Sequence, residues 1–185
     1  MQQLRELQRE IASLKFLDPA CGCGNFLIVT YQALRRLENE IIAELCPKGS
    51  NAFINIDDAV LVSIEQFYGI EIEDWPCEIA KIAMWLTLHK MNVETAKKFG
   101  DHFPTIPLKS SVHICNGNAL TLDWNEVLSA FDCSYILGNP PFAGTGTTSN
   151  EQKQWLKDVY PAKERVINNY AFWQQVTSTH LLSYL

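Results

Sequence analysis

The sequence lacks an excess of positive charge. Its 185 residues carry 15 Lys and Arg against 21 Asp and Glu, which gives a formal net charge of −6, and no stretch gathers Lys and Arg together. Proteins hold nucleic acids mainly through Lys and Arg contacts to phosphates. A strongly basic nucleic-acid-binding module is therefore excluded: either any main phosphate-binding surface lies outside these residues, or the chain has another function.

Long apolar runs are also missing. No run approaches the roughly 20 residues needed to cross a bilayer, and residues 1–10 are polar and mixed in charge, unlike a secretory signal. No low-complexity tract indicates disorder, and a hydrophobic content of 47% is enough to build a core. These features predict a cytoplasmic protein without a membrane partner, and the length favours one domain.

The Cys and His residues form no recognisable metal or disulfide pattern. Six Cys stand at positions 21, 23, 46, 77, 115 and 133 without C-x-x-C spacing, and the four His are scattered. The sequence therefore predicts no metal site and assigns no His to catalysis. Reduced structural thiols are the favoured interpretation.

The most informative stretch that is present reads as a strand, a tight turn and a helix. Leu14 to Leu17 predicts a short buried strand, which Asp18 and Pro19 end, and residues 21–24 form a small glycine-rich turn. Residues 25–45 then follow helical spacing. This order is typical of a nucleotide-binding α/β unit, because glycine lets backbone N–H groups approach a ligand and the helix N-terminus favours an anion.

Further strands and helices alternate along the rest of the chain. The pattern predicts strands at 67–72, 112–115 and 131–137, a helix over 4–14, and a helix from Asp74 to about Met91 with Ile79, Ile82, Ala83 and Leu86 as its buried face. Residues 92–111 are predicted to be a loop. The alternation indicates an α/β fold with a mostly parallel sheet flanked by helices.

Polar or glycine-rich turns follow each predicted strand, at 18–24, 71–74, 116–119 and 138–142. Because the carboxyl ends of parallel strands meet at one edge of a sheet, these turns are expected to converge there. Glu71 ends the second strand, where a carboxylate can accept hydrogen bonds from the ribose hydroxyls of an adenosine group. The alternative is an exposed acid at a strand end.

The string Asp-Pro-Ala-Cys-Gly-Cys-Gly-Asn-Phe at 18–26 resembles the S-adenosylmethionine (AdoMet) loop of DNA methyltransferases, particularly the adenine-specific enzymes of restriction–modification systems. The family usually has Ser where Cys23 stands. The resemblance implies AdoMet as cofactor, with Asn118 meeting its adenine, although a plain turn Asn is the alternative. The implied cofactor-binding residues are Asp18, Pro19, Ala20, Cys21, Gly22, Gly24, Asn25, Phe26, Glu71, Asn118 and Ala119.

The string Asn-Pro-Pro-Phe at 139–142 resembles the catalytic motif of methyltransferases that act on planar, conjugated amino groups. The resemblance implies that the Asn139 side-chain oxygen and the Pro140 carbonyl accept hydrogen bonds from the target amine. It also implies that Phe142 stacks on a flipped base and that Pro141 completes the substrate site. Asn139, Pro140 and Phe142 are thus the candidate catalytic residues, and the two prolines stiffen the turn.

Together the two motifs imply transfer of a methyl group to the N6 amine of adenine in duplex DNA. They resemble large enzymes in which methylation and cleavage share one polypeptide, with the recognition region C-terminal or on another subunit. The implied Rossmann-like class I methyltransferase fold has seven strands, and only four are legible here. Residues 1–142 are therefore expected to form an incomplete core, and residues 143–185 a mobile loop and a helical tail.

Other functions stay open at this point. An RNA or protein-glutamine methyltransferase would share the Asn-Pro-Pro-aromatic motif, and a truncated, inactive AdoMet-binding fragment would fit the short length. The acidic and Lys cluster of a nuclease is not evident in the sequence. Residues 1–185 alone are expected not to methylate DNA specifically, because the net charge of −6 disfavours phosphate contacts.

Overall fold

The computed structural model describes residues 1–45, 59–99 and 112–139. The expected tail, residues 143–185, lies outside the described residues. The elements follow one another as helix α1 (Gln2–Ser13), strand β1 (Phe16–Asp18), helix α2 (Asn25–Leu45), 3-10 helix η1 (Ile64–Gln66), strand β2 (Phe67–Glu71), helix α4 (Asp74–Phe99), strand β3 (His113–Asn116), 3-10 helix η2 (Trp124–Glu126) and strand β4 (Tyr135–Ile136).

The described strands form one parallel sheet in the order β3-β2-β1-β4. Leu17 of β1 is paired with Tyr68 on one side and with Ile136 on the other. The chain moves outward from β1 to β3 and then returns to the opposite side of β1. Parallel α/β sheets bind ligands at such a reversal, outside the carboxyl ends of the strands. The predicted parallel α/β fold is confirmed.

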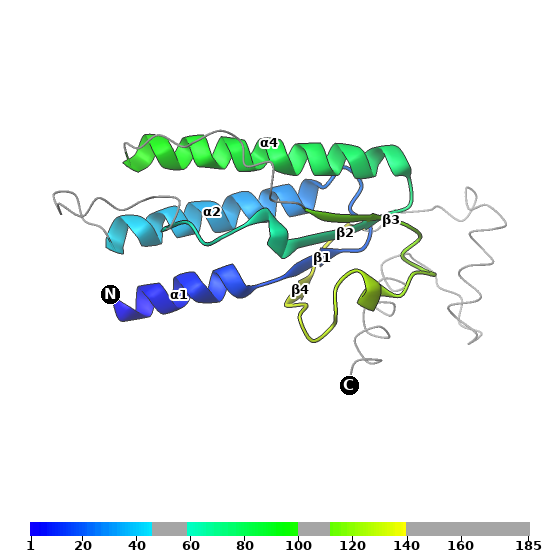
Figure 1. Ribbon diagram of the computed structural model, residues 1–185, viewed down its shortest axis with the longest axis horizontal. Coiled ribbons are helices and arrows are strands. Elements are labelled where there is room, and N and C mark those ends of the chain that lie inside the picture. Colours follow the sequence, from blue (N-terminus) through cyan, green and yellow to red (C-terminus); the bar gives the residue numbers. More distant parts are fainter. Residues whose placement is uncertain (46–58, 100–111, 140–185) are drawn as a thin grey trace.

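The two faces of the sheet have separate hydrophobic cores, because successive strand residues point to opposite faces. Phe16 and Phe67 contribute to a core with the inward faces of the helices, and their rings stack 5.1 Å apart. Leu17 and Ile70 contribute to a second core with Trp124. Figure 1 shows α1, α2 and α4 lying side by side with roughly parallel axes. In the described part of the chain, no helix is long and apolar enough to cross a membrane.

Helix α4 is longer than the sequence pattern predicts. Its beginning agrees with the prediction, since Asp74 and Pro76 occupy the first turn, but it continues to Phe99. The prediction of a loop from residue 92 was wrong for residues 92–99. Asn92 and Thr95 are polar yet buried, because both pack against Arg35 of α2.

Arg35 is the centre of a buried polar network between α2 and α4. Its side chain is 1% exposed, and its guanidinium donates to the Tyr31 hydroxyl at 2.9 Å, to Asn92 Oδ1 at 3.1 Å and to Thr95 Oγ1 at 3.2 Å. Its Nε lies 3.6 Å from Oε2 of the fully buried Glu38. Buried charges are tolerated only when they are paired and hydrogen-bonded, so this network fixes how the two helices meet.

Glu38 extends the network to the segment after α2. Its Oε1 accepts hydrogen bonds from Leu61 N at 2.6 Å, Val62 N at 3.0 Å and Gln8 Nε2 at 3.1 Å. Gln8 belongs to α1, so one carboxylate connects α1, α2 and the chain that leads into β2. The sequence pattern assigns no such role to Glu38, because a charged residue in a helix is usually exposed.

The buried face of α4 differs from the predicted one. Ile82 and Leu86 are 56% and 62% exposed, whereas Ala80 and Met84 are fully buried against the core. Both faces of this helix are apolar, so the spacing of apolar residues does not distinguish them. Contact with the beginning of α2 decides the outcome, because Ala80 lies against Gly24, the residue directly before that helix.

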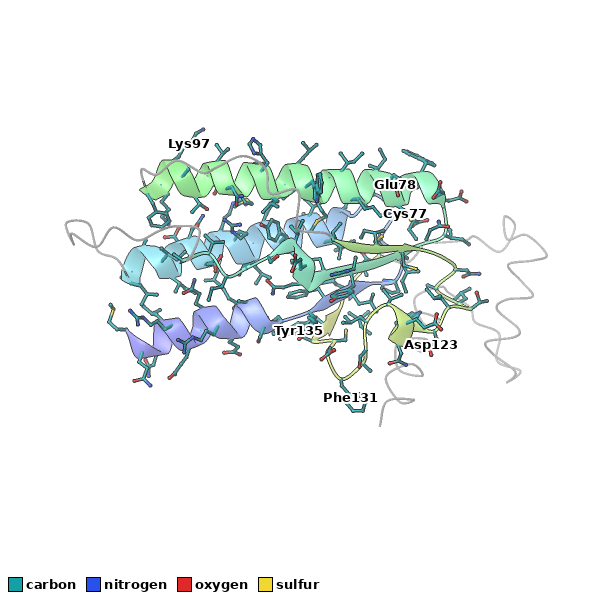
Figure 2. The ribbon with its side chains drawn as sticks, viewed as in Figure 1. Cys77, Glu78, Lys97, Asp123, Phe131 and Tyr135 are labelled. Carbon is teal, nitrogen blue, oxygen red and sulfur yellow. The ribbon has the colours of Figure 1, made fainter. Side chains whose placement is uncertain are left out.

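Strand β4 is shorter than predicted. The predicted strand over 131–137 contains only the ladder residues Tyr135 and Ile136. Phe131 is 91% exposed and lies in a turn before the strand, from which it points away from the sheet (Figure 2). The amide of Cys133 donates to Ser129 O within this turn, so the preceding backbone bonds locally instead of to β1.

Candidate functional site

The loop after β1 is shaped by short hydrogen bonds and by two glycines. Asp18 Oδ1 accepts a hydrogen bond from Ala20 N at 3.1 Å, and Cys21 N donates to Ile70 O of β2 at 3.0 Å. Gly22 and Gly24 have φ angles of +53° and +84°, which L residues rarely adopt. The glycine-rich turn therefore lies across the carboxyl ends of β1 and β2.

Gly22 and Gly24 differ in what a side chain at each position would contact. A Cβ on Gly24 would lie 3.3 Å from Ala80 Cβ, so Gly24 permits the close approach of α2 and α4. A Cβ on Gly22 would meet nothing within 4 Å, so the space beside Gly22 is open in the described structure. Gly24 is explained by its backbone conformation and by helix packing, whereas Gly22 is explained by its backbone conformation alone and leaves room for a ligand.

Glu71 joins the loop after β1 to the turn after β2. Its Oε2 accepts a hydrogen bond from Gly22 N at 2.9 Å, and its Oε1 accepts one from Glu73 N at 3.0 Å. The carboxylate is thus fixed beside the glycine turn at the carboxyl edge of the sheet. The structure brings Gly22 and Glu71 into direct contact, although 49 positions separate them in sequence.

We expect Gly22→Val to abolish measurable AdoMet binding while the helical circular dichroism spectrum is kept. The branched side chain would enter the open space beside Gly22 and would also disfavour its φ of +53°. Calorimetric titration with AdoMet measures the effect. Gly117→Ala is the control, because a Cβ there meets only Leu122 Cδ2 at an ordinary 3.5 Å. Unchanged affinity in Gly22→Val would contradict the prediction that Gly22 binds the cofactor.

Asp18 is a buried carboxyl group at the centre of this edge. Its residue is 1% exposed, and burial raises its pKa to about 7, with the nearby Glu71 charge adding to the rise and the Ala20 N–H opposing it. Asp18 Oδ2 is buried and has no hydrogen-bond partner within the described residues. A carboxyl oxygen of this kind can take a donor from a ligand that enters the site.

The stability of the free protein is expected to depend on pH through Asp18. The folded-state pKa of about 7 exceeds the ordinary value of 3.8, so folding becomes less favourable as the pH rises from about 4 through 7. Asp18→Asn should therefore gain more stability at pH 8 than at pH 5, as measured by urea unfolding. Asp123→Asn is the matched control, because this exposed carboxylate also accepts a backbone N–H, from Asn125. An equal effect of Asp18→Asn at both pH values would contradict the expectation.

The turn after β3 contains Asn118 and Ala119. Asn118 Oδ1 accepts a hydrogen bond from Leu120 N at 3.0 Å, which closes a local turn, and Ala119 O accepts one from Trp124 Nε1 at 2.8 Å. Ala119 is buried in the second core. The proposed contact of Asn118 with the adenine of a cofactor stays a prediction, and the side-chain oxygen already has a structural role.

The turn after β4 lies beside the loop after β1. Leu137 N donates to Leu17 O at 2.9 Å, and a Cβ on Gly138 would lie 2.6 Å from Asp18 Oδ1. Asn139 follows directly and is exposed. The remaining predicted residues of this motif, Pro140, Pro141 and Phe142, lie outside the described residues. Asp18 and Asn139 thus flank the reversal of the sheet from its two sides.

The sequence reasoning missed Asn116, the last residue of β3. Its Nδ2 donates to Glu71 O at 3.2 Å and to Ile72 O at 3.1 Å, and it lies 3.7 Å from Cys77 Sγ. The only sequence signal is an Asn at the start of the polar turn at 116–119, which does not indicate a partner. The contact is visible only when β2 and β3 are placed side by side.

The thiols near the site are free and are not activated. Cys21 and Cys77 are buried and unpaired, and burial raises the pKa of both thiols. A thiol with a raised pKa stays protonated at neutral pH and is a poor nucleophile or metal ligand. Across residues 1–45, 59–99 and 112–139, no group of three or more His, Cys, Asp or Glu side chains is placed to hold a metal ion.

The parallel sheet, the glycine-rich loop after its first strand and the acid after its second define a Rossmann-like α/β domain of the methyltransferase type. A family model described as the MmeI DNA-methyltransferase domain matches residues 1–180. The chain belongs to this family. The resemblance to methyltransferases of restriction–modification systems is thereby confirmed.

Relatives extend well beyond the length of this chain. DNA methyltransferase A of Bacillus subtilis (strain 168) is 37% identical over 161 residues, which cover 85% of this chain and 18% of that protein. The solved structure of the type IIL restriction–modification enzyme MmeI in complex with DNA superposes with a TM-score of 0.90 at 40% identity, over 98% of this chain and 24% of that one. The chain therefore spans about a quarter or less of these relatives.

A more distant likeness concerns the fold alone. The ATP-dependent type ISP restriction–modification enzyme LlaBIII, solved bound to DNA, superposes with a TM-score of 0.52 at 18% identity. The match covers 92% of this chain and 12% of that one. The same arrangement of strands and helices therefore occurs in a second type of restriction–modification enzyme.

Proposed function

We propose that this chain is the AdoMet-binding part of a DNA methyltransferase that methylates the N6 amine of adenine within a restriction–modification enzyme. The observation that carries the proposal is the meeting of two turns at the reversal of the sheet. The loop after β1 is joined to Glu71 through Gly22, and Asn139 follows Gly138, which lies against Asp18. A cofactor site and a catalytic turn would thus share one edge.

The residues at this edge fit AdoMet. The open space beside Gly22 leaves room for the cofactor, and the buried Oδ2 of Asp18 lacks a donor among the described residues. The Glu71 carboxylate stands at the end of β2, where it can accept hydrogen bonds from ribose hydroxyls. When bound, AdoMet supplies the methyl group on its sulfonium. Asp18, Gly22 and Glu71 would hold and orient it.

Asn139 would hold the target amine. Its exposed side chain offers an oxygen that accepts a hydrogen bond from an exocyclic NH₂, which directs the nitrogen lone pair toward the methyl group. The Pro140 carbonyl would accept the second hydrogen bond and Phe142 would stack on the flipped base. Such acceptors matter most in the transition state, where the amine becomes positively charged.

Duplex DNA with a flipped adenine is the proposed substrate, and the structure of MmeI is a complex with DNA. The net charge of −6 suggests that other parts of the enzyme provide most phosphate and base contacts. A recognition region C-terminal to this chain, or on another subunit, is therefore part of the proposal. Action on DNA implies a cytoplasmic location.

The test is methyl transfer from radiolabelled AdoMet by a polypeptide that contains residues 1–185, with duplex DNA, total RNA and protein offered as substrates. Label in DNA, recovered as N6-methyladenine after digestion to nucleosides, supports the proposal. Recovery of N4-methylcytosine would instead identify cytosine as the target base, because the same motif acts on any planar conjugated amine. Label only in RNA or protein would favour the alternative substrates, and no label in any substrate would favour an inactive AdoMet-binding fragment.

A further inference from the structure

The main-chain carbonyl of Glu71 receives three donors. Gly117 N donates to it at 2.8 Å, Asn116 Nδ2 at 3.2 Å, and the Cys77 thiol lies 3.5 Å away. Two of these donors come from the end of β3 and one from α4. The backbone at the end of β2 is therefore held by both β3 and α4. Pairing of β2 with β3 alone would require fewer hydrogen bonds to this carbonyl.

Asn116 also holds the residue after Glu71. The same Nδ2 that donates to Glu71 O donates to Ile72 O at 3.1 Å. One amide nitrogen carries two hydrogens, so it can serve both carbonyls at once. An Asp in this place would have the same shape, but its carboxylate would offer no hydrogen and would face two carbonyl oxygens. The arrangement thus requires an amide.

Fixing this backbone also fixes the Glu71 side chain. The carboxylate is held on its other side by Gly22 N at 2.9 Å and by Glu73 N at 3.0 Å. Glu71 thereby connects the loop after β1 with the turn after β2, and Asn116 fixes the main chain from which the carboxylate extends. A shift of the turn at residues 71–73 would move the carboxylate relative to the glycine loop.

We infer that Asn116 is a positioning residue for ribose recognition: it holds the turn after β2 so that the Glu71 carboxylate faces the ribose hydroxyls of the bound cofactor. The inference rests on the proposed function, since it assumes an adenosine-containing ligand beside Glu71. Asn116 itself touches no ligand in this scheme. Asn116 acts through the Glu71 carbonyl. Replacement of Asn116 should therefore alter the discrimination between ribose and deoxyribose.

The experiment compares calorimetric affinities for S-adenosylhomocysteine and its 2′-deoxy analogue. A hydroxyl bonded to a carboxylate is worth on the order of tenfold in affinity, so the wild-type protein should prefer the ribose form by about that factor. Asn116→Asp should reduce the preference toward onefold, as should Glu71→Gln. The double variant should lose no more than either single variant, because both changes remove the same interaction.

Controls separate positioning from general damage. Asn125→Asp makes the same change in η2, where the Asn125 side chain bonds Asp123 and Ala130 N, and it should keep the ribose preference. If Asn116→Asp does not fold, as judged by circular dichroism, Asn116→Ala provides the same measurement without the added charge. An Asn116 variant that weakens both ligands by the same factor and keeps the preference would overturn the inference. Failure of the wild-type protein to bind either ligand would overturn the proposed function with it.

Discussion

Asn139→Ala is expected to lower the methyl-transfer rate by about 10²- to 10³-fold in any polypeptide that contains this chain and methylates DNA. Removal of one hydrogen-bonding group aimed at developing charge typically has an effect of this size. Asn139 is exposed and follows Gly138, beside the loop after β1, so it does not support the core. AdoMet affinity should be nearly unchanged, since the proposed contact forms only with the target amine.

The measurement combines single-turnover methyl transfer with calorimetric titration of AdoMet. Asn125→Ala is the control, because Asn125 is another exposed Asn, whose side chain bonds Asp123 and Ala130 N within its own segment. It should leave both quantities unchanged. If Asn139→Ala methylates DNA at the wild-type rate, the motif at residues 139–142 serves only to end a strand and has no catalytic role.

Arg35→Met should reduce the free energy of unfolding by about 3–5 kcal/mol, because loss of one partner leaves a buried charge uncompensated. The guanidinium is 1% exposed and its partner Glu38 is fully buried. The variant would also leave the acceptors of Asn92 and Thr95 without their donor between α2 and α4. A loss of this size is a large fraction of the stability of a small domain.

Urea unfolding followed by circular dichroism measures this effect. Arg36→Met is the matched control, since Arg36 is the next residue of α2 but pairs with Glu94 at 3.4 Å on the surface. Exposed ion pairs contribute about 0–1 kcal/mol, so this variant should stay close to the wild type. Equal stabilities of the two variants would show that the buried network does not hold the helices together.

The sequence alone determined the turn and the helix after the first strand, although β1 is Phe16–Asp18 and not the predicted Leu14 to Leu17. The glycine-rich turn and the helix over residues 25–45 were predicted with the correct bounds, because glycine and helical spacing act over a few neighbouring residues. The parallel arrangement of the strands also followed from the alternation of strands and helices along the chain. Glu71 was singled out because an acid at the end of a strand is a local pattern.

Only the tertiary structure decided which surfaces meet. Helix α4 has two apolar faces, and its contact with Gly24 selected Ala80 and Met84 for the core instead of Ile82 and Leu86. Its extension to Phe99 depends on Arg35, a partner 57 positions away from Asn92. These choices rest on contacts between distant segments, which local propensity does not encode.

The same reason limits what could be predicted of the site. The turns that carry Asp18, Glu71 and Asn139 were expected at one edge, but the hydrogen bond from Gly22 to Glu71 and the approach of Gly138 to Asp18 depend on strand order and register. Burial, which raises the pKa of Asp18 to about 7, exists only after the sheet has formed. Asn116 was missed because its partners are Glu71, the last residue of β2, and Ile72, which follows it, and only the pairing of β2 with β3 brings them within hydrogen-bonding distance.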